Sequence, residues 1–582
     1  MQTQLAEIRK EYAALKPEDI LAIDPCQGSG HILVYMFDVL VQIYESYGYT
    51  AREAAASIVE HNLWGIDIDD RAAQLAYFSV MMKARQYDAR FFKRHIQPNI
   101  ISVQESNFLL ANIDELLKEV KLSPEDQVLL KEVLMVCCDA KEYGSILKFD
   151  NGDYAGLLKR WNEATSVRLG ANLSIWDTIA IPAVTNLLHQ AIMLSQKYSI
   201  VVTNPPYMGN MPDKMSAYVK KYYSLYRYDA YSVFISKAED LVHNEGFISL
   251  VTGDSWLTLS SFISMRQNVL QRMSITSLLG LGSSAFESGF GTTAFVLRSL
   301  IKSYKGSFLD CTSLSEDGEK ICEYIRCTRP YFHDNEDFIN APDSEVLYDA
   351  SPSELRLFSH EALSKHLIPK AGIVVGNNDL YMRLWYEVAF SKVRLTAQQG
   401  DAVSLSEWIP LHKGGGYRKY YGIHEYVLHL QQMLEDKSIN KSIRTVDSNY
   451  YFREGITWST LSNKFGVRWS PTGFVYNTKG SMCFSKSEEQ TLLLIGFLNS
   501  KVARRLITVL APNLDFNSGT IVKLPYIEPR ESAEVIAIVR ECIREEKQDW
   551  DSSETPATAP PPGWSLTEKD VCTLKRRGSN AG

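Results

Sequence analysis

The chain has 582 residues, of which 45% are hydrophobic, 22% charged and 11% aromatic. These proportions exclude collagen-like, coiled-coil and wholly disordered proteins. No apolar run approaches the roughly 18 residues of a membrane span, and no signal peptide follows Met1, so we expect a cytoplasmic protein without a membrane anchor. The nine cysteines contain no CxxC pair, and no metal site is expected. The net charge of −8 still allows a basic cleft in so large a chain.

The N-terminal third alternates short apolar runs with helical patterns. An amphipathic helix is expected over residues 5–19, followed by a short strand that ends in a glycine-containing turn at residues 24–30. A long helix from His31 and a second strand ending at Asp67 come next, and Asp69 or Asp70 can cap the helix after it. This order predicts a right-handed βαβ unit of a parallel sheet.

The remainder predicts an interrupted sheet and a second domain. Residues 111–196 have helical patterns and form an expected insertion; further strands are predicted at 198–203, 246–252 and 292–297, with a helix at 231–242. We divide the chain into a sheet domain at 1–300, a connecting region at 301–370, a mixed α+β domain at 371–530, and a helix with a disordered Pro-rich tail at 531–582.

Three motifs fall where predicted strands end, which is where open parallel sheets bind ligands. The first is the turn from Asp24 to Gly30, in which Gly28 and Gly30 let the backbone approach a ligand. The second is Asp67, whose carboxylate suits the hydroxyls of a ribose. Asp67 comes 43 residues after Asp24 and Leu33 replaces a third glycine, so the pattern disfavours a dinucleotide and favours a nucleoside cofactor without a pyrophosphate.

The third motif, Asn204-Pro205-Pro206-Tyr207, follows the strand predicted at 198–203. An exocyclic amino group on a base is a poor nucleophile because its lone pair is delocalised. The Asn204 side-chain oxygen and the Pro205 carbonyl can each accept an N–H bond and so free that lone pair. The prolines stiffen the turn, and Tyr207 offers a ring for stacking against a planar base.

The combined motifs resemble the amino-methyltransferases that use S-adenosylmethionine, in the branch with the motif N-P-P-Y, which mainly methylates N6 of adenine in DNA. Over nearly the whole chain the sequence is similar to the PglX family, the adenine-specific DNA methyltransferases of BREX phage-resistance systems. The similarity rests on the three motifs and on runs of the C-terminal half: Gly376-Asn-Asn-Asp379, Trp408-Ile-Pro-Leu-His-Lys-Gly-Gly-Gly-Tyr-Arg-Lys419, Tyr451-Phe-Arg-Glu-Gly-Ile-Thr-Trp458 and Leu498-Asn-Ser500.

The resemblance implies a Rossmann-like S-adenosylmethionine-dependent methyltransferase sheet with a helical insertion, and a mixed α+β target-recognition domain. It places Asp24, Gly28 and Gly30 at the methionine end of the cofactor, Asp67 at the ribose, Ile68 and Asn107 at the adenine, and Asp229 at the rim of the site. Residues Asn204 to Tyr207 would handle the target base. The expected partners are double-stranded DNA and other BREX components.

Three departures from the family pattern bear on these expectations. Cys26 and Gln27 stand where the family usually has Ala and Cys, and the bulk of Gln27 is expected to affect cofactor affinity. The family has a long helical region upstream of the Asp24 turn and continues well past Asp551. We therefore expect this chain to be shortened relative to the family.

The basic second domain is the expected DNA-reading part. Residues 411–480 carry ten Lys or Arg and five Asp or Glu, a local net charge of +5. Such cations meet phosphates or base edges in DNA-binding proteins. The candidate DNA contacts are Lys413, Arg418, Lys419, Arg453 and Arg468.

Other functions stay open on the sequence alone. A related enzyme could methylate cytosine N4, RNA adenine or a protein glutamine, although cytosine N4 enzymes more often carry Ser in place of Asn204. A non-catalytic DNA-binding or assembly subunit, or an inactive fragment, is the alternative of a different class. The intact motif at residues 204–207 favours an enzyme.

Overall fold

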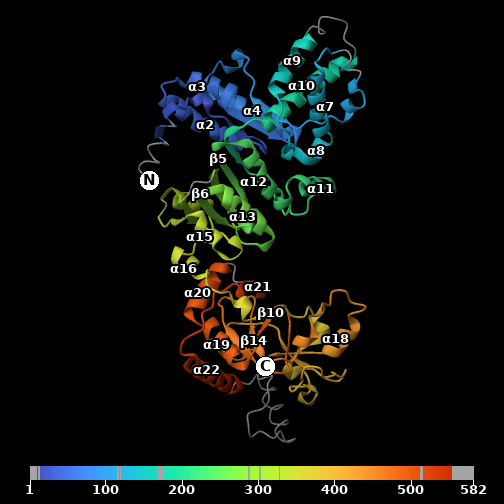
Figure 1. Ribbon diagram of the computed structural model, residues 1–582, viewed down its shortest axis with the longest axis vertical. Coiled ribbons are helices and arrows are strands. Elements are labelled where there is room, and N and C mark those ends of the chain that lie inside the picture. The colour runs from blue at the N-terminus through green and yellow to red at the C-terminus, as the bar shows by residue number, and fades with distance from the viewer. Residues whose placement is uncertain are drawn as a thin grey trace, which may run out of the picture. The chain divides into compact units, whose positions relative to one another are not determined.

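The computed structural model describes residues 9–10, 13–114, 117, 120–166, 175–285, 289–299, 303–326, 328–511 and 515–552 (Figure 1). The chain forms two compact units. Unit 1 runs to Ile339 and includes Asp343–Tyr348; unit 2 contains Asn340–Pro342 and the chain from Asp349 onward. The expected Pro-rich tail lies outside the described residues, as do residues 5–8, 11 and 12 of the helix expected at residues 5–19. The described part of that segment does not continue as one helix to residue 19, because residues 15 and 16 are irregular and Pro17–Asp19 form a separate 3-10 helix.

Unit 1 is built on a nine-stranded sheet in the order β3-β2-β1-β4-β5-β7-β6-β8-β9. All neighbouring strands are parallel except that β7 is antiparallel to β5 and β6, and β9 is antiparallel to β8. The strands are β1 (Ala22–Asp24), β2 (Leu63–Asp67), β3 (Asn99–Ser102), β4 (Tyr198–Thr203), β5 (Val242–Gly253), β6 (Met273–Gly282), β7 (Thr292–Ser299), β8 (Gly306–Asp310) and β9 (Tyr331–His333).

Helices α2 (His31–Ser46), α3 (Ala51–Ser57) and α4 (Asp70–Tyr87) pack together beside the first strands (Figure 1). Their shared core includes Leu33, Phe37 and Val80, which are fully buried. Asp69 is the cap of α4, because its carboxylate accepts hydrogen bonds from the Arg71 and Ala72 amides at 2.7 and 3.3 Å. The predicted βαβ unit is therefore present.

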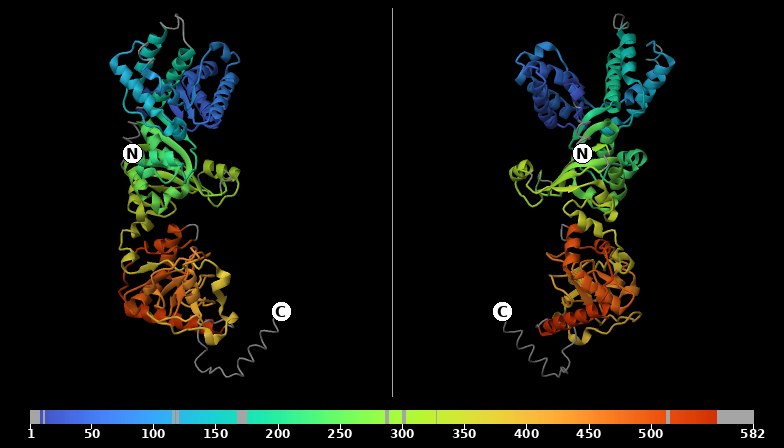
Figure 2. Two further views of the ribbon diagram at one scale, coloured as in Figure 1. Left: turned by 90° about the vertical axis from the view of Figure 1, so that its right-hand side faces the viewer. Right: turned by 60° about the vertical axis from the view of Figure 1, so that its left-hand side comes forward.

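The expected helical insertion is also present. It comprises α5 (Asn107–Leu110), α7 (Pro124–Val136), α8 (Ala140–Tyr143), α9 (Tyr154–Ser166) and α10 (Ile175–Ser195). Both views of Figure 2 show this lobe, in cyan and teal, beside the blue helices α2–α4. It returns the chain to β4, next to β1, so residues far apart in sequence meet at one sheet edge.

One window of the described residues, Thr178–Ser195 in α10, is long and apolar enough by length and composition to cross a membrane, with a mean hydropathy of 1.2. It is not an uninterrupted apolar run of the kind that the sequence analysis excluded, because it contains Asn186, His189 and Gln190. Half of the window is buried in unit 1. Gln190 within it is fully buried, and its side-chain oxygen accepts a hydrogen bond from the Gln104 amide at 2.7 Å, as suits a core helix.

Unit 1 continues past the expected boundary at residue 300. Strands β8 and β9 extend the sheet, and together with β3 and β6 they are the strands that the sequence did not predict. Helices α12 (Ala230–Leu241) and α13 (Ile263–Arg272) also belong to this unit. The predicted α/β methyltransferase-like fold class is confirmed, with the antiparallel strands β7 and β9 as additions.

Unit 2 is mixed α+β, as expected. One sheet has the order β10-β17-β14-β15 and the other β11-β13-β12-β16. The strands are β10 (Ile368–Lys370), β11 (Met382–Leu384), β12 (Ile409–His412), β13 (Tyr426–Leu428), β14 (Gly455–Trp458), β15 (Val467–Ser470), β16 (Val475–Tyr476) and β17 (Met482–Phe484). A core that includes Ile373, Leu411, Tyr476 and Met482 joins the two sheets.

The helices of unit 2 come mainly at its C-terminal end. They are α16 (Pro352–Leu357), α17 (Asn378–Tyr381), α18 (Leu430–Asp436), α19 (Glu488–Leu498), α20 (Lys501–Leu510), α21 (Ser518–Ile521) and α22 (Ser532–Ser552). Helix α22 packs on α19, where Val535 and Val539 lie close to Gly496. This packing accounts for the helix expected after residue 531.

Candidate active site

The three predicted motifs meet at one edge of the unit 1 sheet. Strand β1 pairs in parallel with β2 on one side and β4 on the other, with Asp24 opposite Gly65 and Ile23 opposite Val201. The loops after these strands carry Asp24, Asp67 and Asn204 respectively. Because parallel strands end at a common edge, the three side chains gather where open sheets bind ligands.

Asp24 is fully buried at the end of β1. Its Oδ1 accepts a hydrogen bond from the Cys26 amide at 3.0 Å. Its Oδ2 is buried and has no hydrogen-bond partner within the usual distance and angle limits among the described residues. Burial raises the pKa of this carboxyl to about 7, while Thr203 on β4 opposes part of the rise. A buried carboxyl with a spare acceptor is suited to a positively charged or N–H-bearing ligand.

Gly28 and Asp67 tie the first two loops together. The Gly28 amide donates to Asp67 Oδ2 at 2.9 Å, and the Asp69 amide donates to Asp67 Oδ1 at 2.9 Å. Gly28 has a φ of +52°, and a Cβ added there would meet no atom within 4 Å. The loop therefore faces open space beside a half-buried carboxylate, which retains lone pairs for the two hydroxyls of a ribose.

Gly30 has a packing role in addition to the cofactor contact expected of it. Its amide donates to the Gln27 carbonyl at 2.8 Å, and its φ is +86°. A Cβ at this position would lie 2.9 Å from Ala76 Cα in α4. The glycine is thus explained by close packing of α2 against α4, and a cofactor contact is not needed to account for it.

Gln27 is buried beneath the turn. Its Nε2 donates to the Ile101 carbonyl at 3.2 Å, and its side chain fills the space beside Gly65, where a Cβ would lie 2.0 Å from Gln27 Oε1. The bulky side chain that departs from the family pattern is therefore accommodated inside the α2–sheet packing, away from the open side of Gly28.

The helical insertion supplies part of the site, which the sequence did not predict. The Ser145 hydroxyl donates to the Pro25 carbonyl at 2.5 Å. Lys141 Nζ donates to the Ile68 carbonyl at 2.7 Å and to Asp70 Oδ1 at 2.8 Å. The Ile68 side chain is 44% exposed and lies against Gly144, so it offers an apolar surface beside the Asp67 loop.

Asn107 is held by the same insertion. Its Nδ2 donates to Asp139 Oδ1 at 2.9 Å, and its Oδ1 accepts from the Asp139 amide at 2.8 Å. Lys214, in the helix that follows the Asn204 loop, also bonds to Asp139 at 3.1 Å. Each polar atom of the Asn107 amide thus has one partner already, and one N–H and one lone pair remain for an adenine.

The Asn204 motif forms a rigid exposed turn after β4. Asn204 is exposed and Pro205 is buried, so the turn is anchored while its amide side chain faces outward. The Tyr207 hydroxyl lies 3.3 Å from both Asn204 Oδ1 and the Val251 carbonyl. Burial and the nearby Asp229 raise the pKa of Tyr207 to about 12, so its phenol stays protonated at neutral pH.

Asp229 positions this turn. Its Oδ1 accepts hydrogen bonds from the Met208 amide at 2.9 Å and the Tyr231 amide at 3.3 Å, so it caps α12 and fixes the segment after Tyr207. Phe290, between β6 and β7, packs edge-on against the Tyr207 ring at 5.1 Å between ring centres. Phe290 is 43% exposed, and only its place in a Gly-Phe-Gly turn could have indicated it from the sequence.

Cys26 is not arranged as a nucleophile. Burial and the neighbouring carboxylates of Asp24 and Asp67 raise the pKa of its thiol well above the usual value. A protonated thiol is a weak nucleophile. Cys26 is therefore best described as a small residue of the turn.

Three of the five candidate DNA contacts are occupied within unit 2. Arg418 pairs with Glu546 at 2.9 Å and with Asp549 on α22, and Lys419 Nζ donates to the Asn499 carbonyl at 2.7 Å. Arg468 is 1% exposed in β15. The expectation that Arg468 contacts DNA is therefore contradicted by its burial, and Arg418 and Lys419 have structural partners.

The other two candidates remain accessible. Lys413 Nζ lies 4.2 Å from the centre of the Tyr426 ring, and the Arg453 guanidinium lies 5.4 Å from that of Tyr450. Both side chains are half-buried, and neither forms an ion pair within the described residues. A cation held over a ring keeps its charge available to a phosphate.

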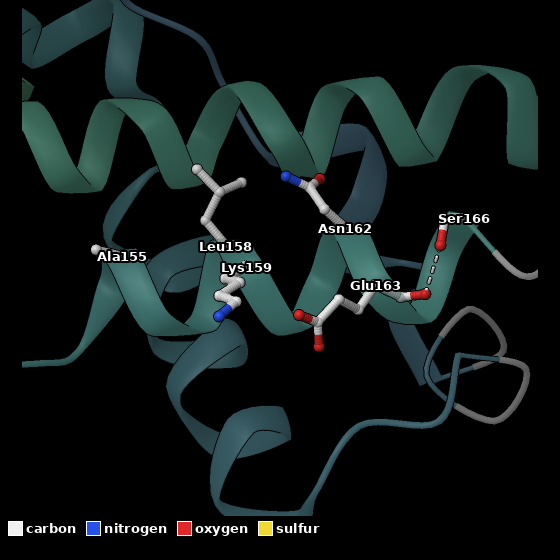
Figure 3. Close-up of a pocket in the computed structure, with 6 residues that line it drawn as sticks. All are labelled: Ala155, Leu158, Lys159, Asn162, Glu163 and Ser166. Carbon is white, nitrogen blue, oxygen red and sulfur yellow. Dashed lines mark hydrogen bonds between the residues drawn. The ribbon is translucent and has the colours of Figure 1, made fainter.

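A separate hollow on unit 1 lies outside this site. It has a volume of about 490 Å³ and is lined by residues of α9 alone: Ala155, Leu158, Lys159, Asn162, Glu163 and Ser166. Figure 3 shows Leu158 and Asn162 directed toward the neighbouring helix, with the Ser166 hydroxyl bonded to the Glu163 carbonyl. No convergent charged or nucleophilic group marks it as a functional site.

Comparison with known sequences supports the family indicated by the motifs. The family model described as Eco57I restriction-modification methylase matches residues 61–286, which include Asp67 and the Asn204 motif. The adenine-specific methyltransferase PglX of Lacticaseibacillus casei (strain Zhang) is 32% identical over 591 residues, covering 97% of this chain and 48% of that protein. The chain resembles PglX.

A second relative gives the same result. The adenine-specific methyltransferase BrxX of Escherichia coli O9:H4 (strain HS) is 31% identical, covering 95% of this chain and 47% of that protein. The chain thus spans about half the length of the PglX and BrxX relatives.

The fold also matches a solved structure. A nuclease-deletion mutant of the Type ISP restriction-modification enzyme LlaGI, in complex with a DNA substrate mimic, superposes with a TM-score of 0.50 at 11% identity. The match covers 93% of this chain and 45% of that one. At this identity the likeness shows only that the two proteins share a fold.

Proposed function

We propose that this chain forms the methyl-transferring and DNA-reading parts of a site-specific DNA methyltransferase. It would transfer methyl from S-adenosylmethionine to N6 of adenine in duplex DNA, acting in the cytoplasm and marking host DNA in BREX phage defence. The observation that carries the proposal is the meeting of the Asp24, Asp67 and Asn204 loops at adjacent strand ends. The resemblance to PglX and BrxX supports the same activity.

The residues present fit S-adenosylmethionine. Its sulfonium carries a fixed positive charge, and Asp24 offers a buried carboxyl with a spare acceptor. Asp67 is placed for the ribose, the open side of Gly28 leaves room above the turn, and Ile68 offers an apolar surface for the adenine. When bound, the cofactor supplies an electrophilic methyl group.

The chain's own residues would prepare the amine. The target adenine must leave the helix stack to reach Asn204, which costs a few kcal/mol. Asn204 Oδ1 and the Pro205 carbonyl would each accept a hydrogen bond from one N6 N–H group and so localise the nitrogen lone pair for attack. Tyr207 and Phe290 would hold the base plane, and Asp229 would keep the turn fixed through the Met208 amide.

DNA and other BREX components are the proposed partners. Among the candidate contacts, Lys413 and Arg453 are the accessible cations of unit 2. The proposed reaction is a direct transfer without a metal: the N6–methyl bond forms as the sulfur–methyl bond breaks, and the methylated amine gives up one proton to water.

Calorimetric titration of S-adenosylmethionine into the purified chain tests the cofactor site. We expect binding, and an Asp67→Ala variant should bind about tenfold to a hundredfold more weakly, because hydrogen bonds to a charged group contribute about 1.5–3 kcal/mol.

Asp310→Ala is the matched control. Asp310 also ends a strand, β8, and accepts a bond from an amide two residues on, that of Thr312, at 2.9 Å. Its loss should leave affinity unchanged. Equal affinities of the two variants would remove Asp67 from the site, and no binding by the natural chain would overturn the proposal that this chain forms the cofactor site.

A further inference from the structure

Unit 2 contains an open groove of about 920 Å³ that no motif of the methyltransferase site uses. Four loops and strand ends build it, around Gly376, Lys413, Lys441 and Lys479. Its cationic lining residues are Lys413, Lys441, Arg444 and Lys479, and Glu425 is its one acidic lining residue.

The loops of this groove are fixed to one another. Gly376 and Gly414 have φ values of +80° and +84°, and a Cβ at Gly414 would lie 2.3 Å from the Lys479 carbonyl oxygen. A Cβ at Gly376 would lie 2.7 Å from Ser442 Oγ. Arg444 exchanges two backbone hydrogen bonds with Val374, at 2.8 and 3.0 Å. The cations therefore project from a rigid frame.

The four cations differ from Arg418 of the same unit in their pairing. Within the part of the chain that the structure describes, none of them forms an ion pair, whereas Arg418 in the same unit pairs with two carboxylates of α22. Lys441, Arg444 and Lys479 are exposed, and Lys413 lies over Tyr426. Like charges gathered on a rigid groove repel one another, and a polyanion relieves that repulsion.

Glu425 is the exception in this lining. Its backbone carbonyl accepts a hydrogen bond from the Trp385 amide at 2.9 Å, and its half-buried side chain faces the groove. A carboxylate repels phosphate, yet it accepts hydrogen bonds from the exocyclic amino groups of bases, above all cytosine N4. In a nucleic-acid groove such a group favours one base over the others.

We propose that this groove binds duplex DNA, with phosphates on Lys413, Lys441, Arg444 and Lys479 and with a base amino group on Glu425. The inference rests on the proposed function, because it names the surface that would choose the methylation site. The occupant is a DNA backbone and not a free anion, since the lining combines separated cations with a base-reading carboxylate.

Salt-dependent DNA binding tests the phosphate contacts. Duplex affinity of the full chain is measured over a range of salt concentrations for Lys441→Ala/Lys479→Ala and for the control Lys486→Ala/Lys501→Ala, whose lysines are exposed and outside the groove. Each lost phosphate contact lowers the slope of log K against log salt by about 0.9, so the groove variant should lose about 1.8. The control should keep the natural slope.

Three results would overturn the proposal that this groove binds duplex DNA. They are equal slopes for the two double variants, absence of duplex binding by the natural chain, and displacement of the duplex by pyrophosphate at equal phosphate concentration. Titration of S-adenosylmethionine into the same proteins distinguishes a failure of the proposed DNA groove from a failure of the proposed function. Retained cofactor binding would leave the unit 1 site intact.

Selection of bound duplexes from a randomised library tests Glu425. The natural chain should enrich a motif, and Glu425→Gln should lose the preference at one position while total duplex affinity rises, because a negative charge is removed. Lys441→Ala should lower affinity without changing the motif. An unchanged motif in Glu425→Gln would remove Glu425 from base reading.

Discussion

Two regions of the molecule bury ionisable groups, and they differ in what lies beside them. In unit 1, Asp24 is buried at a strand end where three loops and an open glycine turn converge. In unit 2, His412, His424 and Arg468 are buried in the interior beside Phe474 and Trp550. The comparison shows that burial of an ionisable group does not by itself indicate a site; what distinguishes Asp24 is the convergence of three loops around it.

The two regions also respond differently to protons. Burial raises the pKa of Asp24 to about 7, so this carboxyl titrates near neutrality. Burial lowers the pKa of His424 to about 3 and that of His412 well below its usual value, with the charge of Arg468 adding to both effects. Both histidines are therefore neutral in the folded protein, and they act as packed aromatic rings.

The largest effect is expected for Asn204→Ala in unit 1. Loss of one polarising acceptor should reduce methyl transfer to DNA adenine about 10²–10³-fold while S-adenosylmethionine affinity is retained. Incorporation of labelled methyl into duplex DNA measures it. Arg468→Met is the contrasting variant and should keep transfer; full activity of Asn204→Ala would contradict the assignment of the target-base site.

Gly30→Ala and Gly28→Ala separate packing from ligand binding within the strand-end site. Gly30→Ala should lower the free energy of unfolding by about 3 kcal/mol, since it combines a positive φ with a Cβ contact to the backbone of α4. Gly28→Ala should cost about 1 kcal/mol of stability but weaken cofactor binding, because its Cβ enters the open side of the turn. Urea unfolding and calorimetric titration measure the two effects, and the reverse order would contradict the roles given to these glycines.

The buried histidines of unit 2, His412 and His424, predict that the stability of the protein depends on pH. A histidine with a lowered folded pKa gives full stability above its unfolded pKa of about 6.5, and that stability falls as the pH decreases toward about 3. Each such group contributes up to about 1.4 kcal/mol per pH unit. Urea unfolding between pH 7 and 5 should show a shallower loss for His424→Phe than for the natural chain. If the free energy of unfolding changed equally with pH in His424→Phe and in the natural chain, His424 would be protonated in the folded state.

The smallest effect is expected for Arg468→Met. Among the described residues no carboxylate pairs with the buried Arg468 guanidinium. Replacing it by an apolar side chain should therefore leave the free energy of unfolding unchanged or raise it by about 1 kcal/mol. Thermal unfolding and duplex affinity are the measurements. A large loss of DNA affinity with retained stability would restore Arg468 as a DNA contact and weaken the contrast between the two regions.

The sequence by itself determined the local parts of the candidate site. Strand β4 and helices α2, α4 and α12 lie within a few residues of their predicted positions, because their apolar periodicity and their caps, such as Asp69, are local signals. The motifs at Asp24, Asp67 and Asn204 were recognisable for the same reason. Each combines a strand end with turn residues a few positions apart.

Only the tertiary structure decided which side chains are available and which distant segments join them. Ser145 and Lys141 lie 120 and 73 residues further along the chain than the Pro25 and Ile68 carbonyls that they contact, separations that no local pattern encodes. Arg418, Lys419 and Arg468 read as surface cations in a basic segment, yet their partners and burial come from α22, α19 and the sheet. Charge and periodicity are properties of neighbours in sequence, whereas ion pairing and burial depend on neighbours in space.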